Sequence, residues 1–282
     1  MQNTQLSKYV QFSSYFSSLD LPHPDSHKGQ NGKVLVVGGS ELFHAASKWS
    51  LDTASKLVDM VFYASVPINN ELVEQAHQKD AKQAFWNGIV VPQEELLSYA
   101  EEADVILIGP GMDRSAETAA KVHELVQAFP NKKWVIDAGA LQMISPRYIP
   151  KQAILTPHQG ELELLKANGF DVEQAVLAGI TIIVKGKVDD IHFLTKDGSV
   201  GSKQVAGGNA GMTKGGTGDV LAGLAAGLFA TQDAQVSAVV ASVTNKAAGD
   251  SLYERVGPYF NASDLVDEVP EVLWRLVAQS KA

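Results

Sequence analysis

The chain has 282 residues, of which 45% are hydrophobic and 20% are charged, a balance typical of a globular enzyme. Its formal net charge of -9 argues against a general role on nucleic acids or anionic membranes, because both require a basic face. The absence of cysteine excludes disulfides, zinc-thiolate sites and cysteine nucleophiles, and we expect a cytoplasmic protein.

The N-terminal residues 1–28 are polar and rich in serine and turn residues. They contain no basic segment followed by an apolar one, so they do not resemble a signal peptide. We expect an arm or a short helix lying on the surface of a single domain over residues 29–282. The longest apolar stretch, residues 220–230, is shorter than the roughly 18 residues that a membrane span requires.

From residue 33 onward, short apolar segments alternate with segments of helical spacing. Strands are expected at 33–39, 61–67, 104–111, 133–141, 152–158 and 180–187, with a hairpin at 190–200. Helices are expected at 45–58, 115–129 and 160–167, from near Asp219, over 235–253 and from 263 onward. This alternation predicts an α/β fold with a mostly parallel sheet and helices on both faces.

Ligands of such sheets bind at the carboxyl ends of the strands. Turn residues follow several of the predicted strands at 38–40, 109–111 and 156–158, and the glycine-rich stretch GNAGMTKGGTGDVLAGLAAG covers 208–227. We expect these segments to converge on one site.

In the glycine-rich stretch, Gly215, Gly216 and Gly218 precede an apolar helix whose N-terminus would attract a phosphate. A carboxylate beside bound phosphate is poorly placed unless it takes a proton from a hydroxyl group that attacks the phosphate. Asp219 is therefore a candidate general base, and the alternative is that it only caps the helix. The stretch lacks the lysine and the spacing of a Walker A loop.

The segment LTPHQGE follows another predicted strand. Thr156 could cap the next helix, with Pro157 at its first position and Gln159 completing a capping box. This alternative leaves His158 and Glu161 unexplained, so His158 could bond a ligand and Glu161 could orient Mg²⁺ through water.

Two further polar residues stand at strand ends. Lys185 could reach a phosphate, although a solvated lysine is the commoner case. Asp137 could hold a turn or face a metal ion.

With these residues in place, the sequence resembles the ADP-dependent NAD(P)H-hydrate dehydratases, which form the carbohydrate-kinase-like branch of the ribokinase superfamily. The resemblance rests on GNAGMTKGGTGDVLAG together with GKVLVVGGS, IGPGM, VIDAGAL, ILTPHQGELELL and VKGK, in that family's order, over roughly residues 30–250. It implies a ribokinase-like three-layer α/β/α fold. The family often carries an additional N-terminal epimerase domain, for which this chain is too short.

The resemblance implies a repair reaction in which ADP, or ATP, phosphorylates the ring hydroxyl of hydrated NADH or NADPH. Expulsion of phosphate then restores NAD(P)H, with AMP as the product from ADP. The implied co-substrate and ion are an adenine nucleotide and Mg²⁺. The implied assembly is a homo-oligomer, possibly a tetramer.

The implied roles fall on residues that match the motifs. Asp219 would be the base, with Gly216, Thr217 and Gly218 forming an anion hole. The nucleotide site would be lined by Lys185, Gly186, Lys187, Val188, Asp189, Gly218 and Asn209. The hydrated dinucleotide would contact Ala46, Gly111, His158 and Asp219. Glu161 would place Mg²⁺.

The chain departs from the family pattern at several positions. Ala45, Ala46 and Ser47 stand where the family usually has Gly-Ala-Pro, Val58 and Met60 stand near usual glycines, and Gly139 replaces an acid. We expect the first two sets to thicken the wall that faces the dinucleotide. They keep two alternatives open: a small-molecule kinase of the same superfamily, and a catalytically silent nucleotide-binding homologue.

Overall fold

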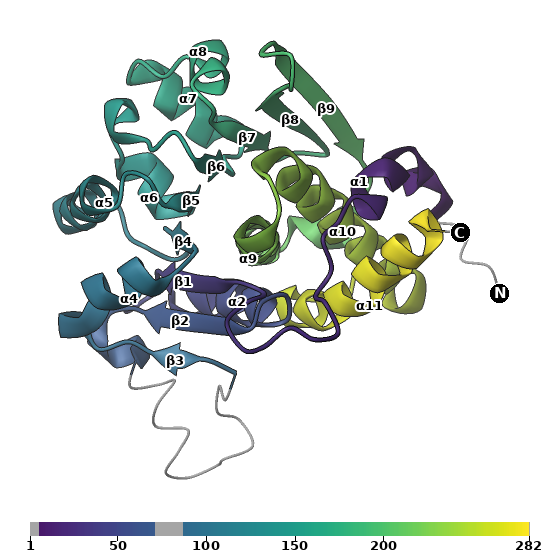
Figure 1. Ribbon diagram of the computed structural model, residues 1–282, viewed down its shortest axis with the longest axis horizontal. Helices are drawn as coiled ribbons and strands as arrows, with labels where there is room; N and C mark the ends of the chain where they lie inside the picture. The colour runs from purple at the N-terminus through teal and green to yellow at the C-terminus, as the bar shows by residue number, and fades with distance from the viewer. Residues whose placement is uncertain (1–5, 71–86, 282) are drawn as a thin grey trace, which may run out of the picture.

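A computed structural model describes residues 6–70 and 87–281, and within these ranges one sheet runs through the molecule (Figure 1). Its strand order is β3-β2-β1-β4-β5-β6-β7-β8-β9. Strands β1 to β7 pair in parallel, and β8 and β9 add an antiparallel hairpin at one edge. The strands are β1 Lys33–Val37, β2 Met60–Ala64, β3 Ile89–Val90, β4 Val105–Ile108, β5 Lys133–Ile136, β6 Ala153–Leu155, β7 Thr181–Val184, β8 Val188–Leu194 and β9 Val200–Ala206.

Helices cover both faces of this sheet. The α-helices are α1 Ser13–Ser17, α2 His44–Ser55, α4 Leu96–Glu102, α5 Ala116–Ala128, α6 Ala138–Met143, α7 Gln159–Ala167, α8 Val172–Leu177, α9 Thr217–Thr231, α10 Ala234–Val256 and α11 Ala262–Ser280. The 3-10 helices are η1 Leu6–Phe12, η2 Gln93–Glu95, η3 Pro146–Tyr148 and η4 Ala210–Thr213.

Alternate residues of the strands point into two separate apolar cores. On β1, Val34 and Val36 join the core formed with α2, α9, α10 and α11, whereas Leu35 and Val37 join the core formed with α4 to α8. The predicted three-layer α/β/α fold is therefore confirmed. Among the described residues, no helix combines the length and the apolar character needed to cross a membrane.

The N-terminal segment contributes to the first of these cores. Leu6, Tyr9, Phe12 and Phe16 of η1 and α1 are each at most 2% exposed, and α1 packs against α10 and α11 (Figure 1). The expected short helix is present, and its apolar side chains are buried in the domain rather than resting on its surface.

Close backbone approaches bring the strand-end loops together. A Cβ atom on Gly109, whose φ is 119°, would lie 1.9 Å from the carbonyl oxygen of Asp137, and one on Gly38 would lie 2.4 Å from the carbonyl oxygen of Pro110. Glycine is therefore required at both positions, and it allows the loops after β1, β4 and β5 to meet at the carboxyl edge of the sheet.

Candidate active site

The glycine turn before α9 presents free backbone N–H groups at this edge. Gly216 is the N-cap residue, with φ 98°. The first helical hydrogen bond runs from the N–H of Val220 to the carbonyl oxygen of Gly216. The N–H groups of Thr217 and Gly218 precede that bond, so they have no partner within the helix. They are placed to donate hydrogen bonds to an anion bound at the positive end of the helix dipole.

Asp219 lies in the first turn of α9 and is not its N-cap residue, so the capping alternative is wrong. The helix begins two residues earlier than Asp219, because Gly216 adopts the left-handed conformation that ends the loop. Burial, followed by the negative charge of Asp137, raises the pKa of Asp219 from 3.8 to about 7, while Lys185 opposes the shift. At neutral pH, its carboxyl group is therefore able to take up a proton.

Lys185 forms a buried ion pair beside this turn. Its Nζ lies 2.7 Å from Oδ1 of Asp137, and the two side chains are 19% and 2% exposed. A Cβ atom on Gly218 would lie 3.5 Å from the same Nζ, so the ammonium group is next to the glycine turn. Burial alone would lower the pKa of Lys185, but the carboxylates of Asp137 and Glu161 raise it above its usual value, and the lysine remains charged. Asp137 is the N-cap residue of α6 but its side chain makes no cap bond, and its carboxylate accepts from Lys185 instead.

His158 and Glu161 cap helix α7, so the cap predicted at Thr156 and Gln159 is wrong. His158 is the N-cap residue: its Nδ1 accepts from the N–H of Glu161 at 3.2 Å, and Oε2 of Glu161 accepts from the N–H of His158 at 2.9 Å. The sequence pattern misplaced the cap because histidine is an uncommon N-cap residue. A bridge between His158 and Lys185 keeps this helix N-terminus beside the ion pair.

The fit of a metal ion depends on the carboxylates at this edge. Both oxygens of Glu161 are engaged, since Oε1 accepts from Nε2 of Gln142 at 3.0 Å and Oε2 serves the cap. Within the described part of the chain, no group of three His, Asp or Glu side chains could hold a metal. An ion at this edge would therefore have to be held mainly by phosphate oxygens and water, and the role of Glu161 toward Mg²⁺ stays a prediction.

A cavity of about 670 Å³ opens beside Gly218 and Lys185. Its lining contains all the residues predicted for the nucleotide, namely Lys185, Gly186, Lys187, Val188, Asp189, Asn209 and Gly218. The volume is in the range of small-molecule sites. Thr217 also lines it, so the same helix N-terminus faces both the cavity and the acid cluster.

Sequence reasoning missed two residues of α10 that line this cavity, Asn245 and Lys246. Lys246 donates to the carbonyl oxygen of Gly186 at 2.9 Å and lies 3.1 Å from Oδ1 of Asp189, which holds the loop after β7. Oδ1 of Asn245 is buried without a hydrogen-bond partner in the described structure, so it could accept one from a ligand. A lysine inside an apolar helix was the available signal.

Two of the residues predicted for the dinucleotide, Ala46 in the first turn of α2 and Gly111 in the loop after β4, are in contact. A Cβ atom on Gly111 would lie 3.2 Å from that of Ala46 and 2.3 Å from the carbonyl oxygen of Phe43, so the start of α2 meets this loop. His158 belongs to the loop between β6 and α7 and not to this contact. The structure thus brings Ala46 and Gly111 together at the carboxyl edge.

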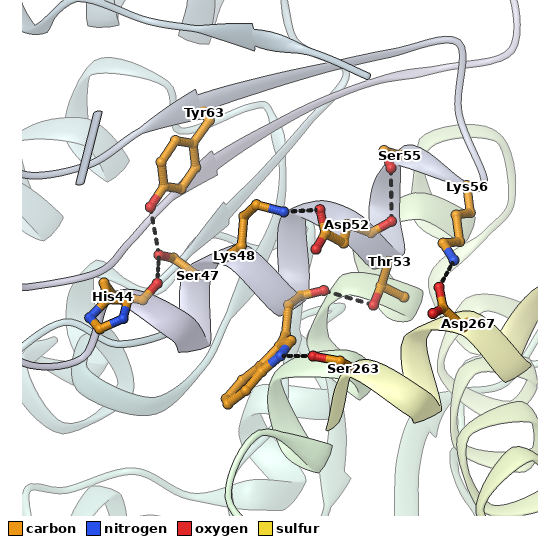
Figure 2. Close-up of polar contacts among 11 residues, drawn as sticks. His44, Ser47, Lys48, Asp52, Thr53, Ser55, Lys56, Tyr63, Ser263 and Asp267 are labelled. Carbon is orange, nitrogen blue, oxygen red and sulfur yellow. Dashed lines mark hydrogen bonds and ion pairs between the residues drawn. The ribbon is translucent and has the colours of Figure 1, made fainter. Parts of the chain in front are cut away.

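At Ser47, Val58 and Met60, the predicted thickening of the wall that faces the dinucleotide is wrong. Ser47 is fully buried and its hydroxyl lies 2.8 Å from that of Tyr63 (Figure 2), so it packs onto β2. Val58 follows α2, and Met60 begins β2, at the opposite, amino edge of the sheet. At Gly139, a Cβ atom would lie 2.2 Å from the carbonyl oxygen of Met112, so this backbone excludes the usual acid.

Comparisons with known proteins identify the family. The family model described as NAD(P)H-hydrate dehydratase matches residues 34–271. A bifunctional NAD(P)H-hydrate repair enzyme of Methanocaldococcus jannaschii is 35% identical over 254 residues, covering 88% of this chain and 49% of that protein. An ADP-dependent (S)-NAD(P)H-hydrate dehydratase of Cenarchaeum symbiosum is 34% identical over 272 residues, covering 88% of this chain and 91% of that protein. The chain thus spans about half the length of the bifunctional relatives.

Solved structures share the fold. A ribokinase-like protein of Enterococcus faecalis superposes with a TM-score of 0.78 at 23% identity, covering 94% of both chains. An ADP/ATP-dependent NAD(P)H-hydrate dehydratase of Bacillus subtilis, co-crystallised with ATP and Mg²⁺, gives 0.73 at 24% identity, covering 93% of this chain and 96% of that one. By its matched family model and its relatives, the chain belongs to the NAD(P)H-hydrate dehydratase family.

Proposed function

We propose that the protein repairs hydrated NADH and NADPH, using ADP or ATP to phosphorylate the ring hydroxyl before phosphate is expelled. The observation that carries the proposal is the position of Asp219 within the first turn of α9. It stands between the anion-binding glycine turn and a cluster of charged groups, with a pKa raised to about 7. A base with a pKa near the working pH suits removal of a proton from a hydroxyl group.

In this mechanism, Asp219 takes the hydroxyl proton while the N–H groups of Thr217 and Gly218 bind the phosphoryl oxygens. Phosphorylation is useful because hydroxide is a poor leaving group and phosphate a good one. Lys185 adds a fixed positive charge at the same place, since Asp137 holds its ammonium group beside Gly218. The developing negative charge thus meets donors that are already oriented.

The cavity beside Gly218 is the proposed nucleotide site. A nucleotide in it would have its phosphates at the N-terminus of α9 and its remaining part against the loops 185–189 and 206–210. We propose Mg²⁺ as the accompanying ion, held chiefly by the phosphates. Bound there, it would neutralise phosphate charge.

We further propose that Ala46, Gly111 and His158 contact the hydrated dinucleotide. The meeting of Ala46 with Gly111 at the carboxyl edge supports the first two. Capping of α7 uses Nδ1 of His158, and its Nε2 lies 3.6 Å from Oε1 of Glu161. The side chain is 58% exposed, so a ligand can still reach it.

The test is incubation with hydrated NADH or NADPH, Mg²⁺, and ADP or ATP, followed by the absorbance of the reduced nicotinamide. We expect absorbance to return with at least one nucleotide, and AMP to form from ADP. No return with either nucleotide would overturn the proposal. Consumption of the nucleotide with another alcohol would then indicate a kinase, and no consumption with any alcohol a silent homologue.

A further inference from the structure

The N-terminal segment is joined by a polar network to the loop that lines the cavity. The hydroxyl of Tyr9 donates to Oδ2 of Asp250 at 2.7 Å, and the N–H of Gly208 donates to the same oxygen at 3.2 Å. Asn209 donates through Nδ2 to Oδ1 of Asp250 at 3.2 Å, and Lys8 forms an ion pair with that carboxylate. Asp250 is 4% exposed, so this is a buried carboxylate with donors on both oxygens.

Tyr9 also fixes the course of the loop by its shape. A Cβ atom on Gly207, whose φ is 141°, would lie 2.1 Å from the Tyr9 hydroxyl oxygen. The loop therefore crosses directly over the phenol, and only glycine allows this approach. Burial, followed by the bond to Asp250, raises the pKa of Tyr9 well above its usual value, so the hydroxyl stays a donor.

The loop 206–210 links the segment to the cavity, and α10, on which η1 also packs, contributes Asn245 and Lys246 to the lining. Residues 206–210 line the cavity, whereas Tyr9, Lys8 and Asp250 do not. Tyr9 donates to Asp250, and the same carboxylate accepts from Gly208 and Asn209 of this loop. Tyr9 is thus placed to act on a ligand indirectly, through the position of Gly207 to Asn209.

We propose that Tyr9 is a positioning residue for nucleotide binding, and that η1 sets the wall of the nucleotide cavity through Asp250. This inference rests on the proposed nucleotide site. A segment that only packed against the core would not change the affinity for ADP or ATP, whereas this inference predicts that η1 does. Ala46, Gly111 and His158, which are proposed to contact the dinucleotide, do not line this cavity, so we expect Tyr9 to leave dinucleotide binding unchanged.

The experiment compares Tyr9→Phe with Tyr15→Phe. Tyr15 is in the same segment, and its hydroxyl accepts from Nε2 of Gln235 at 3.1 Å, away from the cavity loop. Loss of one hydrogen bond to a charged group is expected to raise the nucleotide KM and Kd of Tyr9→Phe by about three- to tenfold. Its kcat at saturating nucleotide and its KM for hydrated NADPH are expected to match those of the wild type and of Tyr15→Phe.

Nucleotide Kd is measured by titration calorimetry with ADP and with ATP, separately from turnover. Equal nucleotide Kd values for Tyr9→Phe, Tyr15→Phe and the wild type would overturn the positioning role, and so would a parallel loss of kcat. If Tyr9→Phe does not fold, Lys8→Gln replaces it, because the Lys8 side chain is 42% exposed, and the same rise in Kd is expected. If the wild type binds nucleotide but does not dehydrate the substrate, the proposed function fails, while the Kd comparison still decides the role of Tyr9.

Discussion

Replacement of Asp219 by asparagine is expected to abolish turnover and at the same time to stabilise the fold above neutral pH. The folded-state pKa of about 7 lies above the ordinary value of 3.8. Between these two values the folded protein binds a proton that the unfolded chain does not, so its stability falls as pH rises through this window and is lowest above pH 7. With one pKa unit worth about 1.4 kcal/mol, the charged carboxylate costs the fold at most about 4 kcal/mol.

Asp219 faces Asp137, Glu161 and Lys185, and the asparagine side chain keeps its shape without the charge. We therefore expect the free energy of unfolding, measured with urea, to be about 2–4 kcal/mol higher for Asp219→Asn than for the wild type at pH 8. The gain should shrink towards pH 5, and nucleotide binding should persist. Wild-type activity should rise with pH through about 7, because the base must be ionised.

The control is Asp59→Asn, at the amino edge of the sheet. Hydrogen bonds from Asn31 lower the pKa of Asp59, so its charge stabilises the fold above pH 4. Asp59→Asn should therefore lower the free energy of unfolding, whereas Asp219→Asn should raise it. The activity of Asp59→Asn should be retained. The reasoning is refuted if Asp219→Asn is no more stable than the wild type at pH 8, or if its advantage grows towards pH 5. Retained turnover would refute the base assignment.

Two other predictions concern the loops at this edge. Gly216→Ala is expected to lower both the melting temperature and kcat, because φ is 98° and a Cβ atom would lie 2.5 Å from the ring of Trp49; Gly215→Ala meets no atom within 4 Å and should leave the melting temperature unchanged. Equal melting temperatures for the two variants would contradict the strain argument. His158→Ala should lower the free energy of unfolding by about 1 kcal/mol, because it removes the α7 cap. His158→Asn should keep the cap and lose only the ligand contact. Titrations should then show weaker dinucleotide binding by both variants with nucleotide Kd unchanged; normal dinucleotide binding by His158→Asn would leave the histidine a purely structural role.

The sequence by itself determined the order of strands and helices, and with it the fold class. Strands that are apolar at successive positions must be covered on both faces, so the sequence predicts a parallel sheet with helices on both sides. The glycine-rich turn, Asp219 and Lys185 were also found from sequence, because they are adjacent to elements with a clear periodicity. Short elements such as β3, α4 and α8 were missed, since they contain too few residues to establish a period.

Tertiary structure alone decided what each polar group contacts. The pairing of Lys185 with Asp137 joins residues 48 positions apart, and the bond of Tyr9 to Asp250 joins residues 241 positions apart. The bridge between His158 and Lys185 joins residues of two neighbouring strand ends. Local sequence patterns report the backbone within a few residues, whereas pKa values and hydrogen-bond partners depend on which distant segments the fold brings together.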